Sequence, residues 1–211
     1  MEKMSGMTQV MTVNGAMLLV LEVRDSVDEL FQQLSLIDLT EFSNLKSDKR
    51  RLEYLGVRLA LKILLGEEKQ IIYDADGKPA LVDNSFQISI SHSGGWVAVM
   101  ADASQKVGID IEVPTNKIEK VYKRFLNDTE QVELFDGKNL NQLMLAWSGK
   151  EALYKIIGIE AVDFANQLHI FPFEVQQEGV FEAEHVQTKT KYKLLYIQNE
   201  AYTLVYCVDQ H

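Results

Sequence analysis

One pattern occurs in both halves of this chain: a long helix-forming segment that ends at a glycine, followed by strand-forming segments. In the first half, residues 61–66 close the helix and residues 96–102 form the last strand. Residues 154–158 and 202–209 are their counterparts in the second half. Self-similarity along a chain indicates repeated structural units. The repeat therefore predicts an α+β fold made of two similar α+β halves.

The repeat places the join near residues 103–106, so we expect an N-terminal half of residues 1–104 and a C-terminal half of residues 105–211. Hydrophobic periodicity, capping residues and turn signals predict the elements of each half. Expected helices cover residues 27–34, 48–65, 116–126 and 143–158. Expected strands cover residues 18–23, 71–73, 81–82, 107–112, 169–175, 180–184, 191–197 and 201–208.

Composition indicates a globular protein of a reducing compartment. Of 211 residues, 46% are apolar and 25% are charged, as in ordinary soluble domains. The one cysteine, Cys207, excludes a disulfide within the chain. The longest apolar run near the N-terminus, residues 16–21, is too short to cross a bilayer and is poorly shaped as a signal peptide. We therefore expect a cytoplasmic protein that does not contact membranes.

Two short segments carry the candidate chemistry. Asp110 and Glu112 lie two residues apart on an expected strand, so both carboxylates leave the same face. Glu151 and Lys155 lie four residues apart on an expected helix and also share a face. Three carboxylates that converge need a cation between them, and oxygen ligands favour Mg²⁺, with Mn²⁺ as a substitute. Such an ion most often serves phosphate chemistry.

The same residues also fit a plainer interpretation. An acidic pair on a strand is usually a solvated face, and a Glu–Lys pair four residues apart on a helix contributes only ~0.3–0.5 kcal/mol. From spacing alone, both interpretations stay open.

Charge is distributed unevenly along the chain. The net charge is −10, which opposes long-range attraction of anionic partners. Two segments, residues 46–62 and 117–124, are nevertheless rich in lysine and arginine. Because salt screens charges beyond ~8–10 Å, such patches matter more for a partner than the total does. They are either docking surfaces for acidic partners or solvated helix faces.

Four motifs resemble, in order, those of the 4′-phosphopantetheinyl transferases of the larger, Sfp-like type. They are Gly-Lys-Pro at residues 77–79, Ile-Ser-Ile-Ser-His-Ser-Gly at residues 88–94, Gly-Ile-Asp-x-Glu at residues 108–112 and Trp-Ser-x-Lys-Glu-Ala-x-x-Lys at residues 147–155. The resemblance implies a pseudo-twofold arrangement of the two halves. It also implies transfer of the 4′-phosphopantetheine group from coenzyme A to a serine of an apo acyl or peptidyl carrier protein, with release of 3′,5′-ADP.

The resemblance also implies roles for particular residues. The metal ligands would be Asp110, Glu112 and Glu151, and the catalytic residues would be Glu151 and Lys155. The coenzyme contacts would be Arg58, Lys78, Ser91, His92, Lys150 and Lys155. For the 3′-phosphate of coenzyme A, Arg58 matches best and Arg51 is the second candidate. The segment between the two acidic motifs would help to dock the carrier protein.

Two other functions compete with the transferase. One is a noncatalytic module that binds carrier proteins, and the other is a Mg²⁺-dependent phosphohydrolase acting on nucleotides. Retention of Asp110, Glu112, Glu151 and Lys155 argues against the noncatalytic module, because a lapsed site has no physical reason to keep all four. We expect no nucleic-acid partner. Two fused halves make one chain sufficient for one site, so a monomer is expected.

Overall fold

The computed structural model describes residues 8–135, 139–158 and 162–209. The chain forms two compact units, Met1–Gln105 and Lys106–His211, each of which mixes helices with antiparallel strands. The α+β fold class is as predicted, while the pseudo-twofold relation between the halves stays a prediction. In the described part, no helix is both long enough and apolar enough to cross a membrane.

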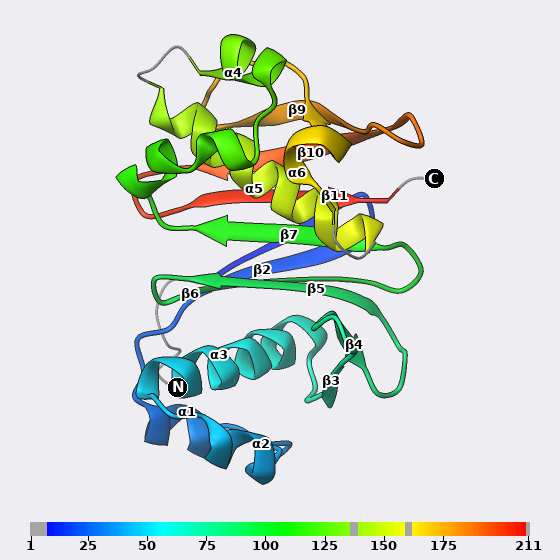
Figure 1. Ribbon diagram of the computed structural model, residues 1–211. Coiled ribbons are helices and arrows are strands. Elements are labelled where there is room, and N and C mark those ends of the chain that lie inside the picture. Colours follow the sequence, from blue (N-terminus) through cyan, green and yellow to red (C-terminus); the bar gives the residue numbers. More distant parts are fainter. Residues whose placement is uncertain (1–7, 136–138, 159–161, 210–211) are drawn as a thin grey trace. The chain divides into compact units, whose positions relative to one another are not determined.

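The N-terminal unit is an antiparallel sheet covered by helices. Its four-stranded sheet has the order β1-β2-β6-β5, and α3 lies between that sheet and the short helices α1 and α2 (Figure 1). A separate two-stranded sheet pairs β3 with β4. The elements are β1 (Thr8–Val13), β2 (Ala16–Glu22), α1 (Val27–Gln32), α2 (Leu39–Asn44), α3 (Asp48–Leu65), β3 (Ile71–Tyr73), β4 (Pro79–Leu81), β5 (Gln87–Ser93) and β6 (Trp96–Asp102).

Local sequence signals explain the ends of α3. The Ser47 side chain accepts a hydrogen bond from the Arg50 amide, so it caps the first turn. Gly66 adopts a left-handed conformation (φ 77°) and ends the helix, as glycine does at many helix C-termini. The predicted helix over residues 48–65 is therefore confirmed.

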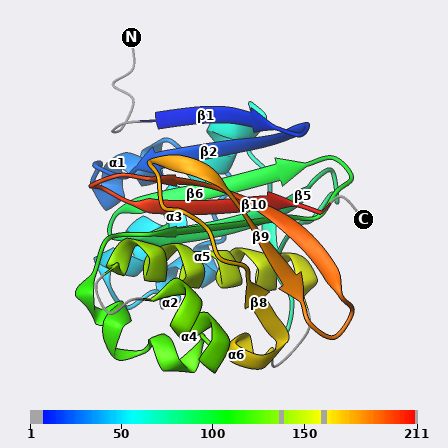
Figure 2. The same ribbon diagram turned by 90° about the horizontal axis from the view of Figure 1, so that it is seen from above.

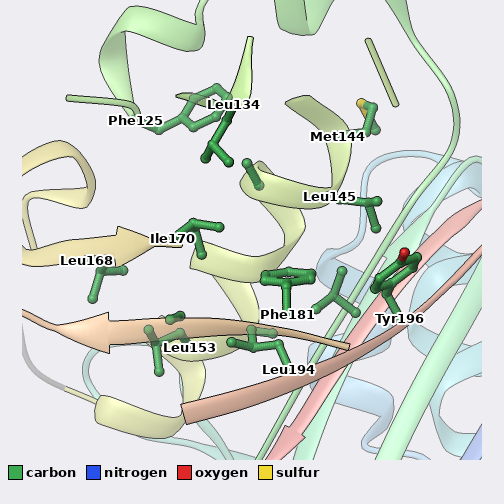
Figure 3. Packing of buried hydrophobic residues seen from close by; sticks show 14 of the residues in the cluster. Phe125, Leu134, Met144, Leu145, Leu153, Leu168, Ile170, Phe181, Leu194 and Tyr196 are labelled. Atoms are coloured by element: carbon green, nitrogen blue, oxygen red, sulfur yellow. The ribbon is translucent and has the colours of Figure 1, made fainter. Parts of the chain in front are cut away.

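The C-terminal unit packs one long helix, α5, against a five-stranded sheet of order β7-β11-β10-β9-β8. In Figure 2, α4 and α6 are grouped beside α5. Figure 3 shows Leu145 and Leu153 of α5 among Phe181, Leu194 and Tyr196 of the strands, where all five are buried. The elements are β7 (Val107–Glu112), η1 (Asn116–Lys120), η2 (Tyr122–Arg124), α4 (Asp128–Leu134), α5 (Leu140–Ile157), α6 (Phe164–Gln167), β8 (Leu168–Ile170), β9 (Glu178–His185), β10 (Thr190–Gln198) and β11 (Thr203–Val208).

Two predicted elements of the C-terminal unit are wrong in form. Residues 116–126 were expected to form one helix, but they form the two short 3₁₀ helices η1 and η2. The break falls at Val121 (φ −124°, ψ −2°), outside the α region, and lets Ile118 and Phe125 both be buried. The strand expected over residues 169–175 stops at Ile170 because Pro172 has no amide to donate to a ladder.

The first strand, β1, was not predicted. It pairs with β2 through a hairpin whose two central residues, Asn14 (φ 50°) and Gly15 (φ 92°), both have positive φ. Asn-Gly is the preferred sequence for this kind of tight turn. The signal was therefore present in the sequence.

Candidate active site

Strand β7 presents two carboxylates at the edge of the five-stranded sheet. Asp110 lies opposite Val205 of β11, and Glu112 lies opposite Thr203. The Asp110 side chain is buried and that of Glu112 is half-buried. Because the two residues are two apart on one strand, both side chains leave the same face.

Helix α5 packs closely against β7 because of a glycine. A β-carbon on Gly108 would lie only 3.0 Å from the carbonyl carbon of Ala152 and 2.9 Å from Cγ1 of Ile156. No other residue would therefore let the strand approach the helix backbone so closely.

One face of α5 meets the carboxylates of β7. Trp147, Glu151 and Lys155 recur at intervals of four, so their side chains share that face. Trp147 donates from Nε1 to Glu112 Oε1 at 3.4 Å. At the other end, Lys155 Nζ donates to Asp110 Oδ1 at 3.1 Å and to the carbonyl of Ile109 at 2.7 Å.

The Glu151 carboxyl lies between these contacts, and its pKa is strongly raised. Burial raises its pKa to about 7, the negative charge of Asp110 adds to the rise, Lys155 opposes it, and Glu112 adds a smaller rise. The structure thus brings four of the predicted site residues, Asp110, Glu112, Glu151 and Lys155, into one electrostatic environment.

The donor chemistry of this cluster fits a hard divalent cation. All three acidic groups offer only oxygen. Burial is the main cause of the raised pKa of Glu151, and the charges of Asp110 and Glu112 add a repulsion that a cation would relieve. Within the described residues, however, no three histidine, cysteine or acidic side chains converge closely enough to hold an ion. Asp110 is paired with the Lys155 ammonium instead. Asp110, Glu112 and Glu151 therefore stay the predicted ligands on the chemistry of their donor atoms alone.

Lys150, predicted to contact the coenzyme, does not lie at this cluster. Its side chain is 0% exposed, and its ammonium donates to Glu130 and to the carbonyls of Phe125 and Phe164. Burial lowers the pKa of Lys150 to about 8, and the carboxylate of Glu130 opposes that shift. With all three ammonium protons donated inside the core, the Lys150 side chain is not placed to contact a ligand.

Sequence reasoning missed two residues, Glu130 and Trp147. Glu130 lies 20 residues from Lys150 in sequence and pairs with it in the core. A signal for Trp147 was available, because it shares the helical spacing of Glu151 and Lys155. Nothing in the sequence indicated Glu130 as the partner of Lys150.

In the N-terminal unit, Arg58 is buried and engaged within the fold. Its guanidinium lies 3.2 Å from Glu41 Oε2, donates to the Tyr54 carbonyl at 3.2 Å, and stacks 3.2 Å from the centroid of the Tyr54 ring. Arg51 pairs with Asp48 at 3.1 Å, and its side chain is 37% exposed against 6% for Arg58. Of the two arginines, Arg51 has the more accessible side chain.

A cavity of about 440 Å³ opens beside His92 in the same unit. Its lining residues are Val23, Lys49, Leu52, Glu53, His92, Ser93, Gly94, Gly95, Trp96 and Val97. His92 Nδ1 lies 3.7 Å from Glu53 Oε1. Ser91 precedes His92 on β5, and Lys78 lies in the turn between β3 and β4, where its amide donates to Asp74 at 2.8 Å. Of the residues predicted to contact the coenzyme, His92 lines this cavity and the others do not.

Comparison with known proteins shows which family the chain resembles. Residues 106–207 match the family model for the 4′-phosphopantetheinyl transferase superfamily. The chain is 32% identical over 142 residues to a putative 4′-phosphopantetheinyl transferase of Haemophilus influenzae, covering 63% of this chain and 58% of that protein. It is 32% identical over 112 residues to the 4′-phosphopantetheinyl transferase Sfp of Bacillus subtilis, covering 51% and 48%. The matches thus span about half the length of these relatives. Residues 106–207 are therefore similar to the 4′-phosphopantetheinyl transferase superfamily.

Proposed function

We propose that this protein transfers the 4′-phosphopantetheine group from coenzyme A to a serine of an apo acyl or peptidyl carrier protein. The observation that carries the proposal is the face of α5 that presents Glu151 and Lys155 to Asp110 and Glu112 of β7. The match of residues 106–207 to the superfamily model and the similarity to the two transferase relatives support it.

In the reaction, the carrier serine Oγ forms a bond to the β-phosphorus of coenzyme A. The bond from that phosphorus to the bridging oxygen breaks, and 3′,5′-ADP leaves with the electron pair. Glu151, directly or through a water, takes the serine proton, because the α5 face holds it beside both the acidic cluster and Lys155. Lys155 contributes a positive charge toward the transferred phosphoryl group.

Mg²⁺, or Mn²⁺ in its place, would be held by Asp110, Glu112 and Glu151 and would neutralise charge on the pyrophosphate. The Lys155 ammonium already faces Asp110, so this side of the cluster is suited to a positive charge. Trp147 donates to Glu112 and thereby orients that carboxylate.

For the nucleotide end of coenzyme A we propose the cavity beside His92. Lys49 and His92 line it and can offer positive charge or a proton to phosphate oxygens. Ser91 and Lys78 stay proposed contacts. For the 3′-phosphate we retain both arginines, and Arg51 has the more accessible side chain.

For the carrier protein we propose a groove of about 500 Å³ between η1 and the start of α5. It is lined by Pro114, Thr115, Asn116, Lys117, Lys120, Leu140, Asn141 and Met144. Its two lysines and its apolar residues suit an acidic helical partner. We propose that the protein acts as a cytoplasmic monomer.

The test is mass spectrometry of apo-carrier proteins incubated with the protein, coenzyme A and Mg²⁺. We expect a carrier mass increased by one phosphopantetheine, and release of 3′,5′-ADP only when an apo-carrier is present. Release without a carrier would instead indicate a phosphohydrolase, and carrier binding without modification would indicate a noncatalytic module. Chelation with EDTA should stop transfer, and Mg²⁺ or Mn²⁺ should restore it.

Glu151→Gln should nearly abolish transfer while the protein stays folded, because the substitution removes the base and one ligand without changing size. Glu182→Gln is the matched control, since Glu182 is exposed on β9. Normal turnover by Glu151→Gln would exclude the proposed role of Glu151.

A further inference from the structure

The core of the C-terminal unit contains a charged pair that the proposed reaction does not use. Lys150 Nζ lies 2.7 Å from Glu130 Oε2, and both side chains are 0% exposed. Lys150 immediately precedes Glu151 on α5. A charged pair placed so deeply, next to a proposed catalytic residue, calls for a physical explanation.

Every proton of the Lys150 ammonium has an acceptor. Besides Glu130, the ammonium donates to the carbonyl of Phe125 at 2.7 Å and to the carbonyl of Phe164 at 2.8 Å. An ammonium has three protons, so these three short bonds use all of them and fix its position. The bonds reach the end of η2, α4 and α6.

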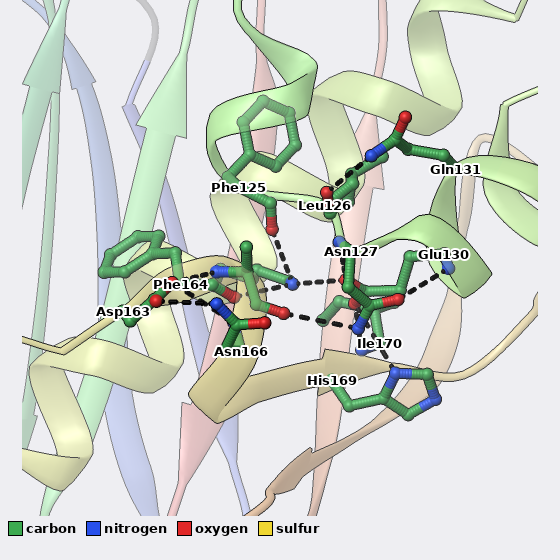
Figure 4. Close-up of polar contacts among 12 residues, drawn as sticks. Phe125, Leu126, Asn127, Glu130, Gln131, Asp163, Phe164, Asn166, His169 and Ile170 are labelled. Atoms are coloured by element: carbon green, nitrogen blue, oxygen red, sulfur yellow. Dashed lines mark hydrogen bonds and ion pairs between the residues drawn. The ribbon is translucent and has the colours of Figure 1, made fainter.

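Glu130 is equally engaged. Its Oε1 accepts from the Ile170 amide at 2.7 Å, and its Oε2 accepts from the Asn127 amide at 3.0 Å (Figure 4). His169 Nδ1 lies 3.7 Å from Oε1. The pair therefore links α5 to the start of α4 and to β8, in addition to the segments that Lys150 reaches directly.

Stability alone does not explain the pair. Removing two charges from water is costly, and well-packed apolar residues of similar size are often at least as stable as a buried ion pair. Hydrogen bonds also fix the orientation of the helix. Apolar contacts tolerate a small rotation of the helix about its axis, whereas three short hydrogen bonds do not. Gly149 adds a steric limit, because a β-carbon there would lie 2.8 Å from Cζ of Phe181.

Helix geometry connects this direction to the proposed site. Successive residues of an α-helix are separated by about 100° around its axis, so Lys150 and Glu151 point to different sides. If Lys150 is fixed on one side, the direction of Glu151 is fixed as well, and so is that of Lys155 one turn later. A small rotation of α5 would move both side chains relative to β7.

We propose that Glu130 and Lys150 are positioning residues, which set the rotation of α5 about its axis and so hold Glu151 and Lys155 against β7. The inference rests on the proposed function, because it assigns the pair a part in the transfer reaction. Neither residue touches the substrates. Both act through the placement of their neighbours.

The main test is the double variant Glu130→Gln/Lys150→Met. The Gln oxygen can still accept from the Asn127 or Ile170 amide, and its NH₂ can donate to a carbonyl that Lys150 leaves, so the fold should persist. We expect a melting temperature within about 4 °C of wild type. We expect kcat to fall tenfold or more, since a misplacement of about 1 Å can cost ~10²-fold, while KM for coenzyme A changes less than about threefold.

Ser148→Ala is the matched control on the same helix. Ser148 is 0% exposed, and its hydroxyl has no hydrogen-bond partner among the described residues. Removing it deletes a buried polar atom without deleting a positioning contact, so kcat should stay within about twofold of wild type. A double variant that is folded and retains wild-type kcat would overturn the proposal.

Two further measurements keep the result decisive. If the double variant does not fold, Glu130→Asp takes its place, because it keeps both charges of the pair but shortens one side chain. A lower kcat at unchanged KM in Glu130→Asp supports the positioning role, and an unchanged kcat refutes it. If the wild-type protein transfers nothing, the proposed function fails, and a crystal structure of the double variant decides the positioning claim by itself. Loss of the 3.1 Å contact between Lys155 and Asp110 would support it, and retention would refute it.

Discussion

Replacing Gly108 by alanine should separate β7 from α5. The added β-carbon would overlap the carbonyl oxygen of Ala152 and approach Cγ1 of Ile156 to 2.9 Å. The Ile156 side chain can adjust, but the Ala152 carbonyl belongs to the helix backbone and cannot rotate away. Overpacking a core typically costs 1–3 kcal/mol, and a rigid obstacle places this case at about 3 kcal/mol or more.

The measurement is urea unfolding followed by the fluorescence of Trp147. The chain has two tryptophans, one in each unit, so a Trp96→Phe background makes the signal report on the C-terminal unit. Unfolding free energies with and without Gly108→Ala are then compared by linear extrapolation. Transfer activity should fall together with stability, because the same displacement moves Asp110 and Glu112 away from α5.

Gly66→Ala separates steric overlap from backbone strain. Gly66 has φ 77° and open space around its missing β-carbon, so alanine there meets only the left-handed conformational cost of ~1–2 kcal/mol. Gly108 is not among the glycines with positive φ, so alanine there adds steric overlap without the left-handed conformational cost. A cost below about 1 kcal/mol for Gly108→Ala, with activity intact, would refute the claim that this glycine sets the strand–helix distance.

Three further predictions follow from buried groups. Burial raises the pKa of Cys207 to about 12, so its thiol should not react with a disulfide reagent at pH 8 until the protein is unfolded in guanidinium. Burial by itself would raise the pKa of Asp102, but hydrogen bonds from neighbouring amides outweigh burial and lower that pKa. The stability advantage of wild type over Asp102→Asn should therefore be complete above the ordinary aspartate pKa of about 4 and vanish as pH falls through the lowered pKa. Urea unfolding at several pH values measures this difference. Arg58→Met should destabilise the N-terminal unit by about 1–3 kcal/mol in urea unfolding, because it removes the contacts with Glu41 and the Tyr54 ring.

Sequence periodicity was sufficient where the relevant residues lie on one regular element. The two-residue spacing of Asp110 and Glu112 and the four-residue spacing of Glu151 and Lys155 each imply a shared face. The long helices ended at Gly66 and Gly158, as glycine signals indicate. These are short-range properties of the chain.

Periodicity was insufficient where packing between distant segments decides. Lys150 stands in the same motif as Glu151, yet helix geometry turns it into the core. Its partner Glu130 forms a capping box with Asn127, which by itself predicts an ordinary helix end. Near Val121, burial of Ile118 and Phe125 replaced the expected helix by two 3₁₀ helices.

The enclosed Lys150 ammonium limits how far the C-terminal unit could be shortened. A reduced version made of β7, α5 and β11 would retain every charged group of the candidate active site. It would lack the carbonyls of Phe125 and Phe164 and the carboxylate of Glu130, so the three contacts that fix the Lys150 ammonium would be lost. A shortened unit that keeps the orientation of α5 therefore needs η2, α4 and α6 as well as the two acidic motifs.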